Sequence, residues 1–577
     1  MSKVYFSTWR DEHINNIGKK EEDWTESAYN LPAQYDEHAS SKAFIGWDGV
    51  ALFDPDIDVV KLATEYAHQY QEYSEACGRC APGRWGGRIL YDSLDKIARG
   101  EGSIDDMEHL KEIGKSMQIT SKCEIGKTVP NPILDLMTHF EDEFMDCIKN
   151  QKPSKHYTQE IGYIAKITAP CTDMCPAHVD IPGYIEGVRD LRFNESIEAT
   201  RQTMPLAHVC GRVCPHPCED ACRRGNLDEA VSIMSLKRLG ADYETDHGYD
   251  FFHPIEKKQS NGKKVAIIGA GPAGLTAAYY LALKGYDITI YEAQAHAGGM
   301  VMYGIPKYRF PIESIDKQIE YMESIGVKIK YNTKVGKDIM FDEIYETNDA
   351  VFVGIGLQKP WNIGIKNEDT PGVIPAIDYL KIINGDKKYD VGKKVAVIGG
   401  GNVAIDGARV AARFDTEVTI LYRRRVEDMP ADWEEIEGAE HEGVKIIPQA
   451  IPTRIIKDDK SGKVIGIEYV KAEMITQDGG RPRPIAIEGS ETIYECDTVI
   501  GAIGQQADFE WLPEKYKNDI IIERGKIQVN DLRQTGNSKI FAGGDSVKYG
   551  NSDAISAIAD GFNAVKGIDK LLLKVKS

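Results

Sequence analysis

The chain has 577 residues, of which 42% are hydrophobic and 28% charged, a composition typical of globular proteins with ample core. Its formal net charge of −20 at pH 7 disfavours contact with a phosphate backbone, so we expect no nucleic-acid partner. The sequence contains no run of about 18 apolar residues, so no membrane span is predicted. The N-terminus lacks the features of a secretory signal, and we therefore expect a cytoplasmic protein.

Cysteines are concentrated in the first part of the chain. Ten of the 11 cysteines lie before residue 223, and nothing indicates a secreted context. Clustered thiols in such a chain indicate metal binding more often than disulfides. The N-terminal part is therefore expected to hold metal, and the length predicts three or four domains.

Two small parts are predicted before the cysteine-rich region. Residues 1–55 are polar and irregular, which predicts an extended arm. Residues 56–150 carry helical patterns, which predict a small all-α domain. The thiols of this domain that could bind metal are Cys77, Cys80 and Cys123.

Residues 151–250 predict a second small α-helical domain, which is rich in cysteine. Four of its thiols stand at four-residue intervals in "CGRVCPHPCEDACRR", and thiolates are the usual ligands of iron–sulfur clusters. Buried free thiols and a zinc site are the alternatives. The six candidate ligands are Cys171, Cys175, Cys210, Cys214, Cys218 and Cys222. They suffice for one 4Fe–4S cluster, and a second would need other ligands, such as Cys147.

At residue 263 the pattern changes to a β-run, a glycine turn, an Ala-rich helix and a second β-run, "KKVAIIGAGPAGLTAAYYLALKGYDITIYEA". Gly269 permits the tight turn, Gly271 lets a pyrophosphate approach, and Gly274 lets the helix pack on the strand. Glu292 follows the second strand and is placed to bind a ribose diol. The segment predicts a dinucleotide site suited to FAD, with glycines kept only for packing as the alternative.

The same pattern returns at residue 393 as "KKVAVIGGGNVAIDGARVAARFDTEVTILYRR". Its second strand ends in Arg423, Arg424 and Arg425 where the first copy has an acid. Arginine at this place favours a ribose 2′-phosphate, which indicates NADPH, with NADH as the alternative. A solvated run of surface charge is the other interpretation of these arginines. The residues expected at this nucleotide are Gly399, Gly401, Asn402, Val403, Ala404, Arg423 and Arg424.

Two C-terminal stretches, "CDTVIGAIGQ" and "TGNSKIFAGGDSVKYGNSDAISAIADGFNAV", fit this scheme. The pairing of "GAGPAG" with "FAGGD" resembles the flavin reductases that carry two dinucleotide-binding domains. The resemblance implies an α/β fold with two Rossmann-like domains after the small helical ones. The FAD domain would be split into residues 263–375 and 500–577, with an NAD(P)H domain over 376–499 between its halves.

The resemblance also implies which residues contact FAD, Asp545 of "FAGGD" among them. The residues expected at FAD are Gly269, Gly271, Pro272, Ala273, Gly274, Glu292, Gly298, Gly299, Arg309, Gly504, Gly544, Asp545 and Ala554. The residues expected to line the isoalloxazine are Gly299, Met300, Ile305 and Arg309. No other catalytic side chain is expected, because the cofactors carry the chemistry.

Many relatives of this kind keep a redox cysteine pair beside the flavin, whereas here Gly298 and Gly299 lead to Met300. "GGMVMYGIPKYRFP", "YRRRVEDMPA" and the cysteine-rich segment resemble the glutamate synthase small subunit. They also resemble the NADPH-binding subunit of the transhydrogenase Nfn and the N-terminal part of dihydropyrimidine dehydrogenase, over about residues 160–577. That resemblance implies two 4Fe–4S clusters. This sequence lacks the first two cysteines of the pattern, and a polar ligand of relatives aligns with Lys237.

The stretches "ACGRCAPGRWGG" and "SKCEIGK" resemble the iron–sulfur domain of the NADH-oxidising flavoprotein subunit of respiratory complex I, over about residues 70–145. The third cysteine of that pattern is replaced here by Gly83. The resemblance implies either a cluster with three thiolates and an outside ligand, or a docking module that has lost its cluster. One to three clusters are therefore expected in the chain.

These patterns together predict an NAD(P)H-dependent oxidoreductase subunit that moves electrons between NAD(P)H, FAD and iron–sulfur clusters. The expected partners are ferredoxin or other redox subunits of a hetero-oligomeric complex. A glutamate synthase small subunit and a non-catalytic iron–sulfur scaffold are the alternatives.

Overall fold

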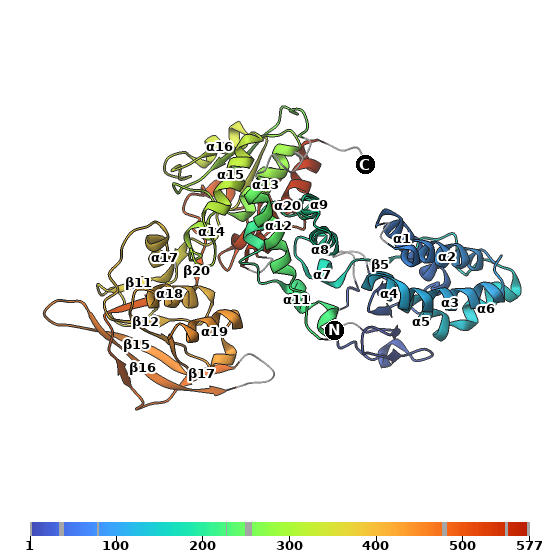
Figure 1. Ribbon diagram of the computed structural model, residues 1–577, viewed down its shortest axis with the longest axis horizontal. Helices are drawn as coiled ribbons and strands as arrows, with labels where there is room; N and C mark the ends of the chain where they lie inside the picture. The colour runs from blue at the N-terminus through green and yellow to red at the C-terminus, as the bar shows by residue number, and fades with distance from the viewer. Residues whose placement is uncertain are drawn as a thin grey trace. The chain divides into compact units, whose positions relative to one another are not determined.

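The computed structural model describes residues 3–29, 31–33, 40–77, 80–226, 228–247, 257–475, 482–548 and 552–573. The chain forms two compact units (Figure 1). Unit 1 comprises Met1–Asp173 and Arg223–Asp228, and unit 2 comprises Met174–Cys222 and Glu229–Ser577. None of the described helices combines the length and apolar character that crossing a bilayer requires.

Unit 1 combines a small sheet with a group of helices. The strand order is β2-β1-β4-β3-β5, and β5 pairs in parallel with β3. The strands are β1 (Phe6–Ser7), β2 (Ile14–Asn15), β3 (Ala43–Gly46), β4 (Gly49–Leu52) and β5 (Tyr163–Lys166). The helices are α1 (Val59–Cys77), α2 (Ala81–Ala98), α3 (Ile104–Thr120), α4 (Glu124–Thr128), α5 (Pro130–His139) and α6 (Glu141–Asn150).

The sheet corrects the expectation of an extended arm over residues 1–55, whereas the described residues of 56–150 form helices and no strand. Phe6, Ile45 and Leu52 are buried in one core with residues of the helices. The sheet also takes in β5, which lies in the segment 151–250 that was predicted to be α-helical. Strands of two to four residues are too short to show a period-2 pattern in the sequence.

Unit 2 begins with the cysteine-rich helices α8 (Ile181–Arg189), α9 (Phe193–Arg201), α10 (Ala207–Cys210), α11 (Pro217–Asp220) and α12 (Ile233–His247). The short helix α7 (Pro170–Met174) lies where the two units meet along the chain. The Tyr280 hydroxyl donates a hydrogen bond to the Arg201 carbonyl at 2.7 Å, and the Gln318 amide donates one to the Pro205 carbonyl at 3.2 Å. These bonds attach the helices to the first nucleotide-binding part.

The first nucleotide-binding part has a parallel five-stranded sheet in the order β23-β9-β6-β7-β8. Its strands are β6 (Lys264–Ile268), β7 (Asp287–Tyr291), β8 (Lys328–Lys330), β9 (Ala350–Val353) and β23 (Ile540–Ala542). Its helices are α13 (Pro272–Leu283), α14 (Met300–Tyr303), α15 (Glu313–Ser324), α16 (Phe341–Thr347) and α20 (Ala554–Leu572). Because β6 has β7 on one side and β9 on the other, its carboxyl end is the topological switch point where ligands bind in such sheets.

The second nucleotide-binding part repeats this arrangement in the order β11-β19-β12-β13-β14. Its parallel strands are β11 (Val373–Pro375), β12 (Lys394–Ile398), β13 (Glu417–Leu421), β14 (Lys445–Ile447) and β19 (Thr498–Gly501). Its helices are α17 (Ala376–Asn384), α18 (Asn402–Ala412) and α19 (Trp433–His441). This sheet includes β11 and β19, so the second part extends a few residues beyond the expected limits of 376–499.

Antiparallel strands complete the second part and connect it to the first (Figure 1). The sheet strands are β15 (Ala450–Lys457), β16 (Val464–Ile475), β17 (Arg483–Ala486) and β18 (Thr492–Tyr494). The two connecting strands, β10 (Lys359–Pro360) and β20 (Gln505–Gln506), pair with each other. A small hairpin of β21 (Ile522–Glu523) and β22 (Lys526–Ile527) follows. The chain therefore leaves the first part and returns to it at adjacent points.

Candidate nucleotide cavity and thiol cluster

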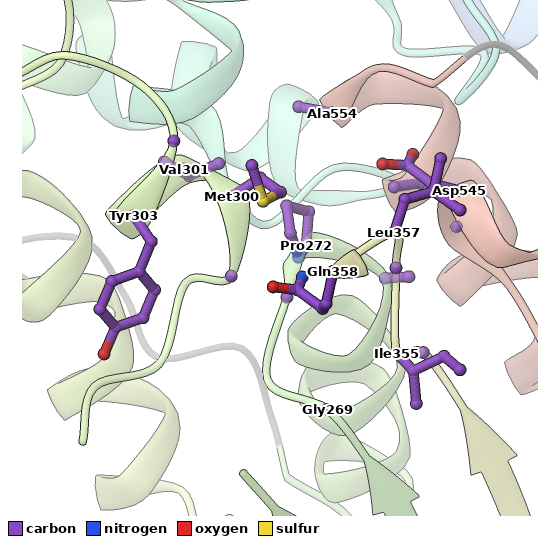
Figure 2. A pocket seen from close by; sticks show the side chains of 18 of the residues that line it. Gly269, Pro272, Met300, Val301, Tyr303, Ile355, Leu357, Gln358, Asp545 and Ala554 are labelled. Atoms are coloured by element: carbon purple, nitrogen blue, oxygen red, sulfur yellow. The ribbon is translucent and has the colours of Figure 1, made fainter. Parts of the chain in front are cut away.

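A cavity of about 490 Å³ lies at the carboxyl end of β6 and is drawn in Figure 2. Its volume lies in the range of ligand-binding pockets. The expected residues that line it are Gly269, Gly271, Pro272, Ala273, Glu292, Gly299, Met300, Ile305, Arg309, Gly544, Asp545 and Ala554, with Asn402 and Val403 of the second motif. One cavity thus brings together residues as far apart in the chain as Val213 and Ala557.

The glycine turn after β6 brings the backbone to the cavity. Gly269 has φ +98°, and a Cβ atom there would lie 2.5 Å from the Gly354 carbonyl oxygen. A Cβ atom at Gly274 would lie 2.0 Å from the Gly269 carbonyl, so this glycine serves helix packing and does not line the cavity. The turn ends at Gly271, the N-cap of α13. The N-terminus of α13 therefore opens onto the cavity.

Glu292 supports the turn and also lines the cavity. Its side chain is buried, with one carboxylate oxygen accepting the Ala270 N–H at 2.8 Å and the other accepting the Gln294 N–H at 2.7 Å. Burial raises the pKa of the carboxyl, and these backbone N–H groups oppose that shift. The remaining lone pairs of the carboxylate can still accept hydrogen bonds from a ligand hydroxyl.

The segment from Gly298 to Arg309 forms another wall. The Gly298 N–H donates to the Ala270 carbonyl at 2.7 Å, and Gly298 does not line the cavity itself. Gly299 has φ +57°, and a Cβ atom there would lie 2.9 Å from the Gly271 Cα. The two glycine turns therefore touch, and Met300 follows them directly at the cavity wall (Figure 2).

Asp545 contributes an acidic side chain from the loop between β23 and α20. Burial, followed by repulsion from Asp553, raises the pKa of Asp545 to about 6. The preceding residue, Gly544, donates its N–H to Asp560 at 2.8 Å, which fixes the loop. Asp553 caps α20 by accepting the Ser556 N–H at 2.8 Å, so the start of α20 also faces the cavity.

Several lining residues were not predicted from the sequence. Leu357 and Gln358 follow β9, which neighbours β6, and the loops that follow neighbouring parallel strands meet at one edge of the sheet. Gln505 lines the cavity although the predicted residue was the adjacent Gly504. The buried Gln505 Nε2 has no hydrogen-bond partner among the described residues. A buried amide without a partner fits a ligand that supplies an acceptor.

The second glycine motif places its helix beside the same cavity. Gly399 has φ +140°, Gly401 is the N-cap of α18, and Asn402 and Val403 line the cavity. Gly399, Gly401 and the buried Ala404 are turn and packing residues that do not line it.

The arginines after β13 differ in their contacts. The Arg425 Nε pairs with Asp428 at 2.9 Å. Arg423 is exposed, and the buried Arg424 Nε has no hydrogen-bond partner among the described residues. Neither Arg423 nor Arg424 lines the cavity itself. The two arginines chosen from the sequence are thus available to an anion outside it.

Four thiols of the cysteine-rich part lie around a buried lysine. Cys175, Cys210, Cys214 and Cys218 are all buried, and Lys237 is only 4% exposed. Burial alone would lower the pKa of Lys237, but these four thiols raise it above its usual value. The Lys237 Nζ donates to the Cys210 carbonyl at 3.4 Å. One buried ammonium among four thiols suits an anionic, thiolate-bound group.

The sulfur atom of Cys214 is the most readily ionised of the set. The pKa of Cys214 is lowered, first by a hydrogen bond from Cys210 and also by Lys237. The His216 N–H donates to the Cys214 Sγ at 3.4 Å. Such contacts stabilise a thiolate, which is the form that binds metal. This part of the chain therefore fits the iron–sulfur group implied by its sequence.

The cysteine-rich part also reaches the nucleotide cavity. Val213 and Pro215, the chain neighbours of Cys214, both line it. Asp553, another lining residue, is close enough to the Cys214 thiol for its charge to influence the pKa of that thiol. This proximity was not visible in the sequence, because it depends on how the helices pack on the first nucleotide-binding part.

The other predicted thiols are placed less closely together. Cys171 packs at the edge of the unit 1 core, and Cys222 is half-buried in unit 2. Cys147 is buried in the unit 1 core, and burial raises its pKa to about 11. Among the described residues, no three His, Cys, Asp or Glu side chains converge closely enough to hold a single metal ion.

In unit 1, Cys80 is half-buried and Cys123 is exposed. Cys77 ends α1, and its side chain lies outside the described set. A Cβ atom at Gly83 would lie 3.1 Å from the Cys80 Sγ. Position 83, where the resembling pattern has its third cysteine, is thus adjacent to one of the remaining thiols.

Comparisons with known families match three parts of the chain. Residues 263–561 match the pyridine nucleotide-disulphide oxidoreductase family, and residues 61–147 match the iron–sulfur binding region of NADH-ubiquinone oxidoreductase F. Residues 163–249 match the 4Fe–4S domain II of dihydropyrimidine dehydrogenase. These matches confirm the predicted α/β fold class with N-terminal helical iron–sulfur parts, and they confirm FAD, NAD(P)H and iron–sulfur clusters as the cofactors.

Known relatives resemble the chain over much of its length. It is 42% identical over 528 residues to the NADPH-Fe(3+) oxidoreductase subunit beta of Geobacter sulfurreducens, covering 90% of this chain and 77% of the relative. It is 36% identical to the NADP(+)-dependent formate dehydrogenase subunit beta of Moorella thermoacetica, covering 99% of this chain and 87% of the relative. It is 35% identical to the glutamate synthase [NADPH] small chain of Escherichia coli, covering 69% of this chain and 87% of the relative.

Proposed function

Because the chain belongs to the pyridine nucleotide-disulphide oxidoreductase family, we propose that NADPH delivers hydride in the cavity and that electrons leave past Cys214 to a partner subunit. The chain is an NAD(P)H-dependent iron–sulfur flavoprotein oxidoreductase, as predicted from its sequence. Two features of this proposal are specific to the chain: the choice of NADPH and the exit route for electrons.

The observation that carries the exit route is the shared wall at Cys214. Its two chain neighbours, Val213 and Pro215, line the cavity that also contains the first glycine turn. Cys214 itself is buried, and its lowered pKa favours the thiolate form. A thiolate ligand at this place links the nucleotide cavity to the group that the thiols hold.

The cavity residues bind and orient the two nucleotides. We assign the ribose contact of FAD to Glu292, the remaining acidic contact to Asp545, and the phosphate site to the N-terminus of α13. Bound FAD accepts two electrons from a hydride donor and releases them one at a time. Met300 and Ile305 are apolar wall residues, which exclude water from the place of transfer.

The second glycine motif holds the hydride donor. Asn402 and Val403 bring the N-terminus of α18 to the cavity. We assign the 2′-phosphate to Arg423 and Arg424, because Arg425 is already paired with Asp428. Guanidinium groups bind phosphate well, so the site favours NADPH over NADH.

Cys175, Cys210, Cys214 and Cys218 would hold an iron–sulfur cluster, with Lys237 as a buried counter-charge. The cluster supplies one-electron transfer. Cys171 and Cys222 remain candidate ligands, and Cys77, Cys80 and Cys123 remain candidates for a second site in unit 1.

We propose that the chain works within a complex, because the relatives that match 90% and 99% of it are beta subunits of larger oxidoreductases. The glutamate synthase small chain matches only 69% of the chain, so the first interpretation is favoured over that alternative. The expected partner is a redox subunit or a ferredoxin-like protein that carries electrons one at a time.

The test uses the anaerobically purified chain. NADPH should bleach the flavin absorbance faster than NADH does, and the EPR signal of a reduced iron–sulfur cluster should follow. In Cys214→Ser, NADPH should still bleach the flavin while the EPR signal is lost. Cys496→Ala removes a buried thiol that does not line the cavity and is the matched control. An unchanged EPR signal in Cys214→Ser would contradict the exit route, and a flavin that NADPH leaves oxidised would contradict the function.

A further inference from the structure

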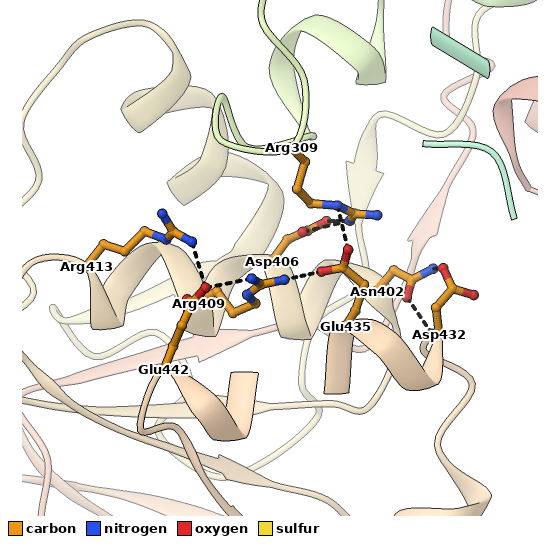
Figure 3. A network of polar contacts seen from close by, with 8 residues as sticks. All are labelled: Arg309, Asn402, Asp406, Arg409, Arg413, Asp432, Glu435 and Glu442. Carbon is orange, nitrogen blue, oxygen red and sulfur yellow. Dashed lines mark hydrogen bonds and ion pairs between the residues drawn. The ribbon is translucent and has the colours of Figure 1, made fainter. Parts of the chain in front are cut away.

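The cavity wall formed by the segment from Gly298 to Arg309, here called the flavin wall, contains one arginine that is bound to the second nucleotide-binding part, as Figure 3 shows. Arg309 was expected to line the isoalloxazine, and it does line the cavity. Its Nη1, however, donates to both carboxylate oxygens of Asp406 at 2.9 and 3.0 Å. Its Nε pairs with Glu435 at 3.0 Å. A single side chain therefore holds α18, through Asp406, and α19, through Glu435.

These contacts are shielded from water. The side chains are 13% exposed at Arg309, 6% at Asp406 and 18% at Glu435. An exposed ion pair contributes little because solvent screens it, whereas breaking a buried pair leaves an uncompensated charge. The geometry at this place is therefore held firmly.

The residue before Arg309 extends the same contact. Arg413 lies 3.6 Å and Arg409 4.9 Å from the ring centroid of Tyr308. Arg409 also pairs with Glu435, and with Glu442 at 2.6 Å. Tyr308 and Arg309 thus insert as a pair between charged side chains of α18 and α19.

The position of Asp406 gives this contact a role beyond stability. Asp406 lies one helical turn after Asn402, and residues four apart share one face of a helix. Both residues line the cavity, together with Met300 from the flavin wall. Any rotation or shift of α18 that moved Asn402 away from Met300 would have to break the Arg309–Asp406 pair.

We propose that Arg309 and Asp406 are positioning residues that hold the N-terminus of α18, and with it the bound nicotinamide nucleotide, against the flavin cavity. This inference rests on the proposed function. It predicts that the pair controls the rate of hydride transfer and not the affinity for NADPH, because displacement of a reacting group by about 1 Å can slow a reaction by about 100-fold.

The experiment measures flavin bleaching in the anaerobic holoprotein by stopped flow at a series of NADPH concentrations. In Asp406→Asn, which keeps the shape and removes the charge, the limiting rate should fall by about 10- to 100-fold. The NADPH concentration that gives half of that rate should change less than about 2-fold, as should the FAD content. Arg309→Lys keeps the positive charge but loses the forked guanidinium, so its limiting rate should lie between those of Asp406→Asn and wild type.

Lys307→Met is the matched control, because Lys307 lies in the same segment and pairs with the exposed Asp386. It should bleach at the wild-type rate. An unchanged limiting rate in Asp406→Asn would overturn the inference. If Asp406→Asn loses FAD or fails to fold, Arg309→Lys decides: an unchanged limiting rate there overturns the inference, and a lowered rate with retained FAD supports it. Failure of NADPH to bleach the wild-type protein would count against the proposed function instead.

Discussion

At the residue scale, single buried charges organise the cavity. Glu292 binds two backbone N–H groups of the loops beside it, so its carboxylate is part of the scaffold before any ligand arrives. Its sequence position predicts a ribose contact, because its distance from Gly274 is what such sites require. The support that it gives to the glycine turn could not be predicted, because Ala270 and Gln294 meet it only in the folded loop.

Glu292→Gln should therefore weaken both FAD binding and the fold. The amide nitrogen of glutamine cannot accept a hydrogen bond, so one of the two backbone N–H groups loses its partner at a cost of about 1–3 kcal/mol. FAD retained after gel filtration and the free energy of unfolding in urea measure the two effects. Glu417→Gln removes an exposed partner of Lys445, so neither the retained FAD nor the free energy of unfolding should change measurably. Full FAD retention in Glu292→Gln would contradict this role.

Asp406 predicts how the reaction depends on pH. Burial raises the pKa of Asp406 from 3.8 to about 6, although the facing Arg309 and Arg409 oppose the shift, and Glu435 adds to it. Between pH 3.8 and about 6 the folded protein keeps a proton on Asp406 that the unfolded chain has lost, so the stability that this group contributes is fully present below pH 3.8 and is lost as pH rises through about 6. The charged pair between Asp406 and Arg309 forms only above the folded pKa, so its population increases as pH rises through about 6.

The limiting rate of flavin bleaching should therefore increase as pH rises through about 6. Asp545 titrates in the same range, so the contribution of Asp406 is the difference between the profiles of wild type and Asp406→Asn. The inflection near pH 6 should shrink in this variant. Identical profiles would show that the pair does not titrate in the working range.

Lys237 predicts a property of the thiol-bound group. A positive charge beside an anionic cluster favours its reduced form, because reduction adds negative charge. Lys237→Met should lower the reduction potential of the cluster, as measured by redox titration followed by EPR. Lys237→Arg keeps the charge and should lie closer to wild type. Equal potentials in the Met and Arg variants would refute a role for the charge.

At the element scale, the strand–turn–helix units were the most predictable part of the fold. β6 and α13 lie where the glycine motif predicts them, and β12 and α18 repeat the pattern. The strands of unit 1 were missed, because two-residue strands such as β1 carry no periodic signal. The loop with Gln358 was also missed, since only the order of strands in the sheet brings it to the cavity.

The contact between the two glycine turns gives a prediction about elements. Gly299→Ala should lose FAD, because its Cβ would lie 2.9 Å from the Gly271 Cα and its φ is +57°. Gly262→Ala is the matched control, since it also has positive φ, +71°, with nothing within 4 Å of the added atom. The control should cost about 1 kcal/mol of stability and keep its FAD. Comparable FAD loss in both variants would show that backbone strain alone is responsible.

At the scale of the whole molecule, the sequence predicted which functional parts are present better than it predicted their contacts. The iron–sulfur, flavin and nicotinamide parts were each identified from local spacing, and the family matches confirm them. Val213 and Pro215 line the cavity, and Arg309 pairs with Asp406, only because segments far apart in the chain pack together. Such contacts leave no local pattern in a single sequence.

The strand pair β10 and β20 has a consequence for how the enzyme can be altered. Lys359 pairs with Gln506 and Pro360 pairs with Gln505, so the stretch from residue 361 to 504 begins and ends at adjacent positions of one strand pair. The second nucleotide-binding part could therefore be excised there and replaced by the corresponding part of a relative with a different coenzyme preference. Such a replacement would need only two junctions in the chain. The graft would have to bring its own counterparts of Asp406 and Glu435, or it would be attached without being aligned.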